Sequence, residues 1–358
     1  MRIVIAGGGT GGHLFPAVAL AETFRAQDPA DKILFVGTKN SLEISTLSER
    51  GFDHMGIAVA GLKGRDLWQQ VRSLAKIPKG FFQAIGIIWR FNPDIIVGVG
   101  GYASGPVALA ARLMGKKVVI HEQNILPGFT NRILARIASR IFISFPDTLA
   151  MFKSSKTVIT GNPVRREILL AKKTKKTNRR FKLLIVGGSQ GAHAINRAIT
   201  EALDYFQKPD QIDFVHQTGA NDLKWVADIY EHHGIDATVK PFFEDMASAY
   251  SCADLIVCRA GATTIAELTA LGKPAIYIPF PFAVNNHQEL NARYITDAFG
   301  GEILLEKDLS GDLLARKIDK YFSNPEALHD MSARTAALGR PEAADYIVDE
   351  CKRLLVLS

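Results

Sequence analysis

Cysteines, long apolar runs and targeting segments are scarce in this chain, and each absence excludes a class of protein. The 358 residues contain three cysteines, Cys252, Cys258 and Cys351. Their spacing fits neither a zinc site nor a disulfide framework, so we expect a reducing compartment. No apolar run reaches the roughly 20 residues of a membrane-spanning helix, and a strand predicted from Arg2 leaves no room for a signal peptide. The sequence therefore predicts a protein that is made and kept in the cytoplasm.

Two common nucleotide-binding signatures are also missing. A domain that binds NAD normally carries an acidic residue at the end of its second strand, where it holds the ribose diol. Here the second predicted strand is followed by Gly37, Thr38 and Lys39. No P-loop lysine follows any of the glycine-rich turns. These absences argue against NAD and against a P-loop enzyme, and the sequence predicts no cofactor.

The chain does contain a repeated glycine-rich pattern. Residues 2–13 read RIVIAGGGTGGH, and residues 182–193 read KLLIVGGSQGAH. A third segment, IIVGVGGYASGP at 95–106, predicts a strand, a Gly-Gly turn and a helix capped near Ser104. Apolar strands that end in glycines bring backbone N–H groups close to an anion at a helix start. We therefore predict two nucleotide-type domains with anion-binding turns, the alternative being that the glycines only make tight turns.

Strands and helices alternate along both halves of the chain. Strands are expected at 2–6, 32–36, 95–99, 117–121, 140–144, 156–160, 182–186, 212–216, 237–240, 254–257 and 275–279. Helices are expected after Gly12, near Ser41, Leu67, Ser104 and Gly128, and over 191–206, 221–233, 263–271 and 286–298. This alternation predicts right-handed βαβ units and a mostly parallel sheet in each half, which is the α/β class.

The boundary between the halves is expected near residue 163. Pro163 and the basic run KKTKKTNRR at 172–180 interrupt the alternation there. We predict a first domain over 1–163 and a second over 164–341. A C-terminal helix over 342–358 is expected to pack back on the first domain.

Charge is distributed unevenly between the two halves. Residues 1–163 hold 19 Lys and Arg against 10 Asp and Glu, whereas residues 183–340 hold 13 against 21. A basic half attracts nucleic acid, an anionic membrane or a lipid pyrophosphate. Neither a zinc-finger spacing nor an RNA-binding aromatic motif is present. We therefore expect an anionic membrane surface as partner and no nucleic acid.

Seven motifs occur in an order that resembles a known enzyme family. They are GGGTGGH (7–13), GVGGYASGP (98–106), HEQN (121–124), GNPVR (161–165), GGSQGA (187–192), CRAGATTIAE (258–267) and NNHQ (285–288). Together they resemble the MurG family of peptidoglycan N-acetylglucosaminyltransferases, and the resemblance covers nearly the whole chain.

This resemblance implies a fold and a reaction. The fold is GT-B, with two Rossmann-like parallel-sheet domains facing across a cleft. The implied reaction moves GlcNAc from UDP-GlcNAc to the 4-hydroxyl of MurNAc in undecaprenyl-pyrophosphoryl-MurNAc-pentapeptide, converting lipid I to lipid II with inversion. The first domain would bind lipid I and the membrane, and the second UDP-GlcNAc. The resemblance also implies a peripheral protein on the cytoplasmic side of the cell membrane.

Glycosyl transfer requires that the leaving diphosphate be stabilised. Enzymes that use a divalent cation for this often carry Asp-x-Asp, which this chain lacks, so we predict no metal. The predicted alternative is helix N-termini, which carry about half a positive charge. By resemblance, Ser189 and Arg165 contact the donor. The other donor-binding residues implied by resemblance are Thr10, Gly11, Gly12, Asn124, Phe243, Ala262, Thr263, Thr264, Ile265, Ala266, Glu267 and Gln288.

Glu267, Gln288 and Asn286 also have simpler interpretations. Glu267 resembles the residue that holds the ribose hydroxyls, but a carboxylate near a helix start also stabilises the helix dipole. Gln288 and Asn286 resemble sugar contacts, but amides also cap helices.

His13 is the candidate general base, because a histidine at the mouth of a glycine turn can take a proton from the acceptor hydroxyl. The alternative is a role only in acceptor binding or phosphate electrostatics. Acceptor binding is also expected of Gly100, Gly101, Tyr102 and Ser104. His193, the repeat partner of His13, is expected at the surface.

A segment over 65–91 mixes bulky apolar and basic residues, as interfacial helices do. Leu74, Ile77 and Phe81, near Lys76 and Lys79, are the candidates for membrane contact. The alternative, favoured for 85–89, is a helix that faces the core.

Three other functions stay open from the sequence. One is another UDP-sugar enzyme of the same fold, either a glycolipid glycosyltransferase or a UDP-GlcNAc 2-epimerase. The second is an NAD-linked dehydrogenase, and the third a membrane-associated protein that binds a sugar nucleotide without turnover.

Overall fold

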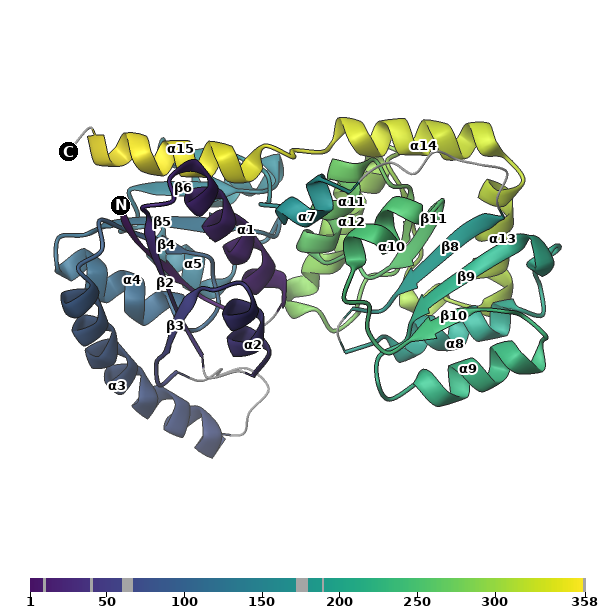
Figure 1. Cartoon of the computed structure of the whole chain (residues 1–358), viewed down its shortest axis with the longest axis horizontal. Helices are drawn as coiled ribbons and strands as arrows, with labels where there is room; N and C mark the ends of the chain where they lie inside the picture. The colour runs from purple at the N-terminus through teal and green to yellow at the C-terminus, as the bar shows by residue number, and fades with distance from the viewer. Residues whose placement is uncertain (9–10, 39–40, 60–66, 172–179, 189, 357–358) are drawn as a thin grey trace. The chain divides into compact units, whose positions relative to one another are not determined.

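The computed structural model covers the whole chain and describes it except at residues 9–10, 39–40, 60–66, 172–179, 189 and 357–358. Side chains at 41–42 and 67–77 are likewise outside the description. The chain divides into two compact units (Figure 1). Unit 1 comprises Met1–Arg165 and Pro341–Ser358, and unit 2 comprises Arg166–Arg340. The division thus falls after Arg165, two residues beyond the boundary predicted after Pro163.

Unit 1 is built on a parallel sheet. Within its described residues seven strands pair in the order β3-β2-β1-β4-β5-β6-β7. Their bounds are β1 Arg2–Ala6, β2 Lys32–Gly37, β3 Asp53–Gly56, β4 Ile95–Gly98, β5 Lys117–Glu122, β6 Arg140–Ile143 and β7 Thr157–Ile159. The central strands are continuous apolar runs because both faces of the sheet are covered.

Helices cover the two faces of this sheet. They are α1 Gly11–Gln27, α2 Ser41–Glu49, α3 Leu67–Phe91, α4 Ser104–Leu113, α5 Phe129–Leu134, α6 Leu149–Phe152 and α15 Ala343–Val356. Ile3 and Ile5 of β1 pack with α1 and α15, whereas Val4 and Ala6 pack with α3, α4 and α5. This alternation is the two-residue period of a strand. The C-terminal helix α15 packs against α1 and buries Ile347 in the same core.

Unit 2 repeats the plan with a smaller sheet. Six described strands pair in parallel in the order β10-β9-β8-β11-β12-β13. They are β8 Phe181–Val186, β9 Ile212–Gln217, β10 Thr238–Lys240, β11 Leu255–Cys258, β12 Ala275–Tyr277 and β13 Glu302–Ile303. The helices are α7 Arg166–Leu169, α8 His193–Ala202, α9 Leu223–His232, α10 Met246–Cys252, α11 Ala262–Leu271, α12 His287–Asp297, α13 Gly311–Phe322 and α14 Pro325–Ala337.

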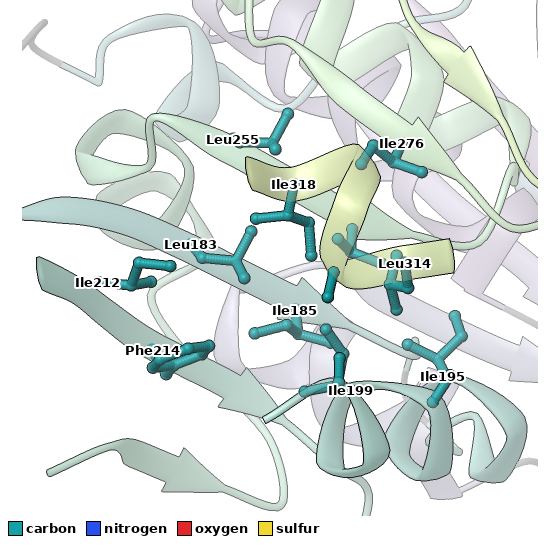
Figure 2. Close-up of a cluster of buried hydrophobic side chains, with 14 of the residues drawn as sticks. Leu183, Ile185, Ile195, Ile199, Ile212, Phe214, Leu255, Ile276, Leu314 and Ile318 are labelled. Atoms are coloured by element: carbon teal, nitrogen blue, oxygen red, sulfur yellow. The ribbon is translucent and has the colours of Figure 1, made fainter. Parts of the chain in front are cut away.

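The core of unit 2 lies between several strands of its sheet and helices that include α8 and α13, which are distant in sequence (Figure 2). Ile185 of β8 is fully buried between Ile199 of α8 and Leu314 of α13. Burying a side chain of this size contributes about 1.5–3 kcal/mol. The core therefore holds α8 in place, and with it the end of the glycine-rich turn that precedes this helix in unit 2.

The predicted α/β class with parallel sheets is confirmed in both units. Two edge strands, β3 and β13, were not predicted, because Asp53–Gly56 and Glu302–Ile303 are short and lack an apolar run. The predicted helix start at Ser104 is confirmed, but no side chain caps the helix as predicted near this residue. Ala103 occupies the N-cap position of α4, with no side-chain hydrogen bond, and Ser104 is the first residue of the helix.

Candidate active site

Two glycine turns of unit 1 touch each other through their backbones. They follow the adjacent strands β1 and β4. A Cβ atom added to Gly7 would lie 2.5 Å from the carbonyl oxygen of Gly100, and one added to Gly101 would lie 2.7 Å from that of Gly8. Positive φ angles of 150° at Gly7 and 81° at Gly101 add a second reason for glycine. No other residue fits these positions without displacing the turns.

Ser104 supports this contact through its side-chain hydroxyl. Its hydroxyl is fully buried and lies 2.5 Å from the carbonyl oxygen of Ala6 and 2.8 Å from that of Gly100. A hydroxyl has one proton to donate, and here two backbone acceptors share it. The structure thus places Ser104 beneath the predicted acceptor-binding turn, whereas Tyr102 on the same turn is exposed.

Sequence reasoning missed a buried carboxylate beneath the first turn. Glu43 of α2 is buried and accepts hydrogen bonds from the backbone N–H and the hydroxyl of Thr38. A Cβ atom at Gly8 or Gly37 would lie 2.5 or 1.6 Å from its carboxylate oxygen. These glycines therefore make room for Glu43, which is a structural reason for them beside the anion-binding reason given above.

His13 lies in the first turn of α1, beside the glycine turn that follows β4. Its imidazole is half-buried, and its Nδ1 lies 3.1 Å from Oε1 of Gln123. A Cβ atom at Gly100 would lie 3.0 Å from the ring, so this glycine also makes room for the imidazole. Among the neighbouring candidates, Gly11 and Gly12 begin α1, and Thr10 lies outside the described residues.

The HEQN motif is mostly internal. His121, Glu122 and Gln123 are buried, and only Asn124 is half-buried. The Glu122 carboxylate accepts hydrogen bonds from the backbone N–H groups of Asn124 and Gly128 at 3.0 Å each. This carboxylate therefore shapes the loop that carries Asn124, the one predicted ligand contact of the motif.

Arg165 belongs to unit 1, whereas the predicted boundary after Pro163 puts it in the donor domain. Its side chain is buried, with the guanidinium 4.3 Å above the ring centre of Phe15 in α1. A cation in this position is stabilised by the ring face and is held against the same helix that carries His13.

In unit 2 the glycine-rich turn is held by a buried glutamine that sequence reasoning also missed. Nε2 of Gln217 donates to the carbonyl oxygen of Gly188 at 3.0 Å, and the backbone N–H of Phe243 donates to its Oε1 at 2.9 Å. The backbone N–H of Phe243 is therefore engaged within the protein. Ser189 itself lies outside the described residues. The one sequence signal for Gln217 is a polar residue at the end of an apolar strand.

Helix α11 presents the CRAGATTIAE motif. Thr263, Thr264 and Ala266 are half-buried, whereas the side chains of Ala262, Ile265 and Glu267 are buried, so Ile265 offers only its backbone. Glu267 lies in the second turn, and the first turn holds no acidic residue. Because the dipole effect falls off within one turn, the helix-dipole interpretation of Glu267 does not fit this position.

The NNHQ motif spans a constrained turn at Asn285 and Asn286 and the first two residues of α12. Asn285 and Asn286 have φ angles of 55° and 54°, in the left-handed region. Oε1 of Gln288 accepts a hydrogen bond from the backbone N–H of Phe280 at 2.9 Å, and Nδ2 of Asn286 donates to Glu289. Strained backbone of this kind concentrates at functional sites.

The comparisons with known proteins cover both units. Residues 3–143 match the glycosyltransferase family 28 N-terminal domain, and residues 182–347 match the family 28 C-terminal domain. A protein of Syntrophus aciditrophicus is 47% identical over 100% of this chain and 99% of its own length. One of Thermodesulfovibrio yellowstonii is 44% identical over 99% of each chain. Both are named UDP-N-acetylglucosamine--N-acetylmuramyl-(pentapeptide) pyrophosphoryl-undecaprenol N-acetylglucosamine transferase.

A crystal structure of MurG from Acinetobacter baumannii superimposes with a TM-score of 0.80 and 31% identity, over 98% of this chain and 99% of that one. The chain belongs to the MurG family. Its fold is accordingly GT-B, with two Rossmann-like parallel-sheet domains.

Membership of the MurG family distinguishes this chain from UDP-sugar enzymes that share only its fold. A UDP-GlcNAc 2-epimerase of Neisseria meningitidis shares the fold at a TM-score of 0.69 but only 14% identity.

Within the described residues of this MurG-family chain, no three His, Cys, Asp or Glu side chains are grouped to hold a metal ion. None of its described helices is long and apolar enough to span a membrane.

Proposed function

We propose that this chain transfers GlcNAc from UDP-GlcNAc to the 4-hydroxyl of MurNAc in undecaprenyl-pyrophosphoryl-MurNAc-pentapeptide, forming lipid II from lipid I. The observation that carries the proposal is the 47% identity, over the full length of both chains, to a relative named for this reaction. The identity spans both units, so it includes donor and acceptor sides alike.

The proposed chemistry is a single displacement. The MurNAc 4-oxygen attacks C1 of GlcNAc, the bond from C1 to the phosphate oxygen breaks, and UDP leaves with inversion at C1. His13 takes the proton of the attacking hydroxyl, a role for which its half-buried place beside the glycine turn is suited. Helix N-termini and the Arg165 guanidinium offset the charge that develops on the diphosphate.

Donor and acceptor are assigned to different units. Unit 2 would hold UDP-GlcNAc through Ser189, the backbone of Phe243, the α11 residues Ala262 to Glu267, and Gln288. By resemblance, Thr10, Gly11, Gly12, Asn124 and Arg165 of unit 1 also contact the donor. The acceptor would lie against His13, Gly100, Gly101 and Tyr102, with Ser104 supporting the turn. The exposed phenol of Tyr102 and the tight Gly7 and Gly101 contacts support this arrangement.

The direct test is product formation from radiolabelled UDP-GlcNAc and lipid I. We expect label in the lipid fraction, with turnover that persists in the presence of a chelator. Formation of UDP-ManNAc without lipid I would instead support the epimerase alternative. Binding of UDP-GlcNAc without any product would support the binding-protein alternative, and turnover that strictly requires magnesium or manganese would contradict the metal-free chemistry.

We further propose that unit 1 binds an anionic membrane through neighbouring helices α3, α4 and α5. Phe82 and Trp89 of α3 are 69% and 76% exposed, and Leu113 of α4 and Phe129 of α5 are exposed as well. Basic residues Arg90, Arg112 and Arg132 lie on the same three helices. Exposed apolar side chains with a basic rim are typical of interfacial helices.

This surface revises the sequence candidates. Phe81 is half-buried against the core of unit 1, and the side chains of Leu74 and Ile77 lie outside the description. Within 85–89, Ile88 is buried as the core alternative required, but Trp89 is exposed.

Vesicle binding tests the surface. The double variant Phe82→Ser, Trp89→Ser should bind phosphatidylglycerol vesicles at least about tenfold more weakly, because two large apolar side chains no longer enter the interface. Phe282→Ser removes an equally exposed aromatic residue from unit 2 and serves as control. Equal loss in both variants, or none in either, would contradict the assignment.

A further inference from the structure

The orientation of the Gln123 side chain is determined by a backbone carbonyl. Its Nε2 lies 2.8 Å from the carbonyl oxygen of Val99. A carbonyl oxygen can only accept a hydrogen bond, so this end of the amide must be the NH2 group. The other end, Oε1, therefore faces Nδ1 of His13 at 3.1 Å.

A second carbonyl determines the proton position on His121. Nε2 of this fully buried histidine lies 3.1 Å from the carbonyl oxygen of Gly161, so Nε2 carries the proton. Nδ1 lies 3.2 Å from Nε2 of Gln123 and accepts from it. Burial lowers the pKa of His121 to about 4, against a smaller opposing effect of the Gly161 hydrogen bond, so the ring is neutral near pH 7.

We propose that Gln123 and His121 are positioning residues that fix the proton of neutral His13 on Nδ1 and leave Nε2 as its proton acceptor. The series of hydrogen bonds runs from His121 through Gln123 to His13. The backbone carbonyls of Gly161 and Val99 set the direction of each bond in it. The catalytic consequence rests on the proposed function, in which His13 accepts the proton of the attacking hydroxyl.

The opposite tautomer of His13 would disrupt the whole series. With Nδ1 unprotonated, its lone pair would face Oε1 of Gln123, and two acceptors would repel each other. Rotating the amide of Gln123 by half a turn would relieve that contact, but Oε1 would then face both the Val99 carbonyl and the Nδ1 lone pair of His121. Because all these groups except His13 are buried, water cannot repair the mismatches.

The same arrangement suits the protonated state of His13. When Nε2 takes up a proton, the Nδ1–H group keeps its bond to Gln123 and the ring does not need to turn. Gly100, whose added Cβ would lie 3.0 Å from the ring, holds the backbone close to the imidazole in either state. A preoriented base of this kind avoids reorganisation during the reaction.

Nitrogen NMR of the full chain with labelled histidine tests the tautomer without reference to activity. Neutral His13, identified through the missing signal of His13→Asn, should be protonated on Nδ1 in the unsubstituted chain. Gln123→Met, which keeps the side-chain length and removes both hydrogen-bonding atoms, should shift the population toward Nε2–H. Gln217→Met removes a buried glutamine from unit 2 and should leave the His13 signal unchanged.

An Nε2–H form in the unsubstituted chain would overturn the proposal, and that measurement stands even where Gln123→Met does not fold. An unchanged tautomer in a folded Gln123→Met chain would overturn it too. In kinetics, Gln123→Met should lower kcat at least about tenfold with little change in the KM for UDP-GlcNAc, because the base presents its wrong nitrogen. Gln217→Met should mainly raise that KM, because Gln217 holds the turn and the backbone of Phe243.

Failure of this proposal is distinguishable from failure of the proposed function. Full turnover of His13→Asn would refute His13 as the base and leave the tautomer result intact. Loss of turnover in His13→Asn together with an Nε2–H ring would refute the positioning series alone.

Discussion

Each unit of the molecule carries a buried histidine close to a buried glutamine at the end of a parallel strand. In unit 1 these are His121 in β5 and Gln123 directly after this strand, and in unit 2 they are His216 and Gln217 at the end of β9. Burial lowers the pKa of both histidines, to about 4 for His121 and about 3 for His216. The two pairs are thus alike in burial and in the neutral state of the imidazole.

The two pairs differ in where their hydrogen bonds end. Nε2 of His216 lies 3.0 Å from Oδ1 of Asn196, and its Nδ1 lies 3.2 Å from the hydroxyl of Tyr230, both of them buried. In unit 1 the series leads to half-buried His13. A repeated strand-and-turn plan therefore supports two roles. In unit 2 His216 bonds to buried side chains and Gln217 holds the glycine-rich turn, whereas in unit 1 the pair orients the half-buried imidazole of His13.

The strongest way to break this comparison is to replace His13 and its repeat partner in the same manner. His13→Asn should lower kcat by about 10²–10⁴-fold with little change in donor affinity, because the proposed base is lost. His193→Asn should leave turnover near its original value. As expected from the sequence, His193 is exposed, with 71% of its side-chain surface accessible, and it bonds only to Asp222 among the described residues. Steady-state kinetics of both variants measures this difference. Similar losses of kcat in the two variants would refute the distinction.

Glycine replacements sharpen the comparison at the level of the turns. Gly101→Ala in unit 1 and Gly191→Ala in unit 2 would place Cβ 2.7 and 2.2 Å from backbone oxygens of Gly8 and Thr218. Both should lower the free energy of unfolding by about 3 kcal/mol or more, since an overpacking cost adds to the left-handed backbone cost of about 1–2 kcal/mol.

Gly115→Ala and Gly234→Ala are matched controls for these turns. They have similar positive φ angles, 75° and 64°, but an added Cβ meets no atom within 4 Å. Only the backbone cost of about 1–2 kcal/mol should appear in urea unfolding. Equal losses in all four variants would mean that the close approach of the turns contributes nothing.

Much of this architecture could be predicted because it follows from local patterns. Apolar runs such as 2–6 and 182–186 have the length and the burial of parallel strands, and the glycines after them mark turns that only glycine can form. Edge strands β3 and β13 escaped prediction because a strand paired on one side needs no apolar run. The motifs, in turn, placed the candidate site at the strand ends.

The supporting side chains could not be predicted from sequence. Gln123 and His13 are 110 residues apart, and nothing in either segment indicates that their side chains meet. In the sequence, Glu43 is an ordinary helix residue. Only the structure shows that Gly8 and Gly37, which lack Cβ atoms, leave space for its carboxylate. Such contacts depend on tertiary packing, which places residues from different crossovers at one sheet edge.

Acid titration gives the smallest expected effect and tests whether the two buried histidines are equivalent. Because the folded-state pKa of each is lowered, the unfolded chain binds a proton first, and stability falls as pH drops from about 6.5 toward 4. The contribution of each of these two histidines to stability should be about 2 kcal/mol smaller at pH 5 than at pH 7. Hydrogen exchange of the β5 and β9 amides measures the two units separately.

His216→Gln should remove the loss at β9 and keep it at β5, whereas His329→Gln, at an exposed position of α14, should change neither. The window above pH 5 also excludes Glu302, whose pKa is lowered to about 2 although desolvation opposes this, because Lys317, Lys320 and Tyr321 donate to its carboxylate. A loss at β9 that survives His216→Gln would mean that some other group of unit 2 takes up the proton. The likeness between the two histidines would then extend to their burial but not to their part in acid unfolding.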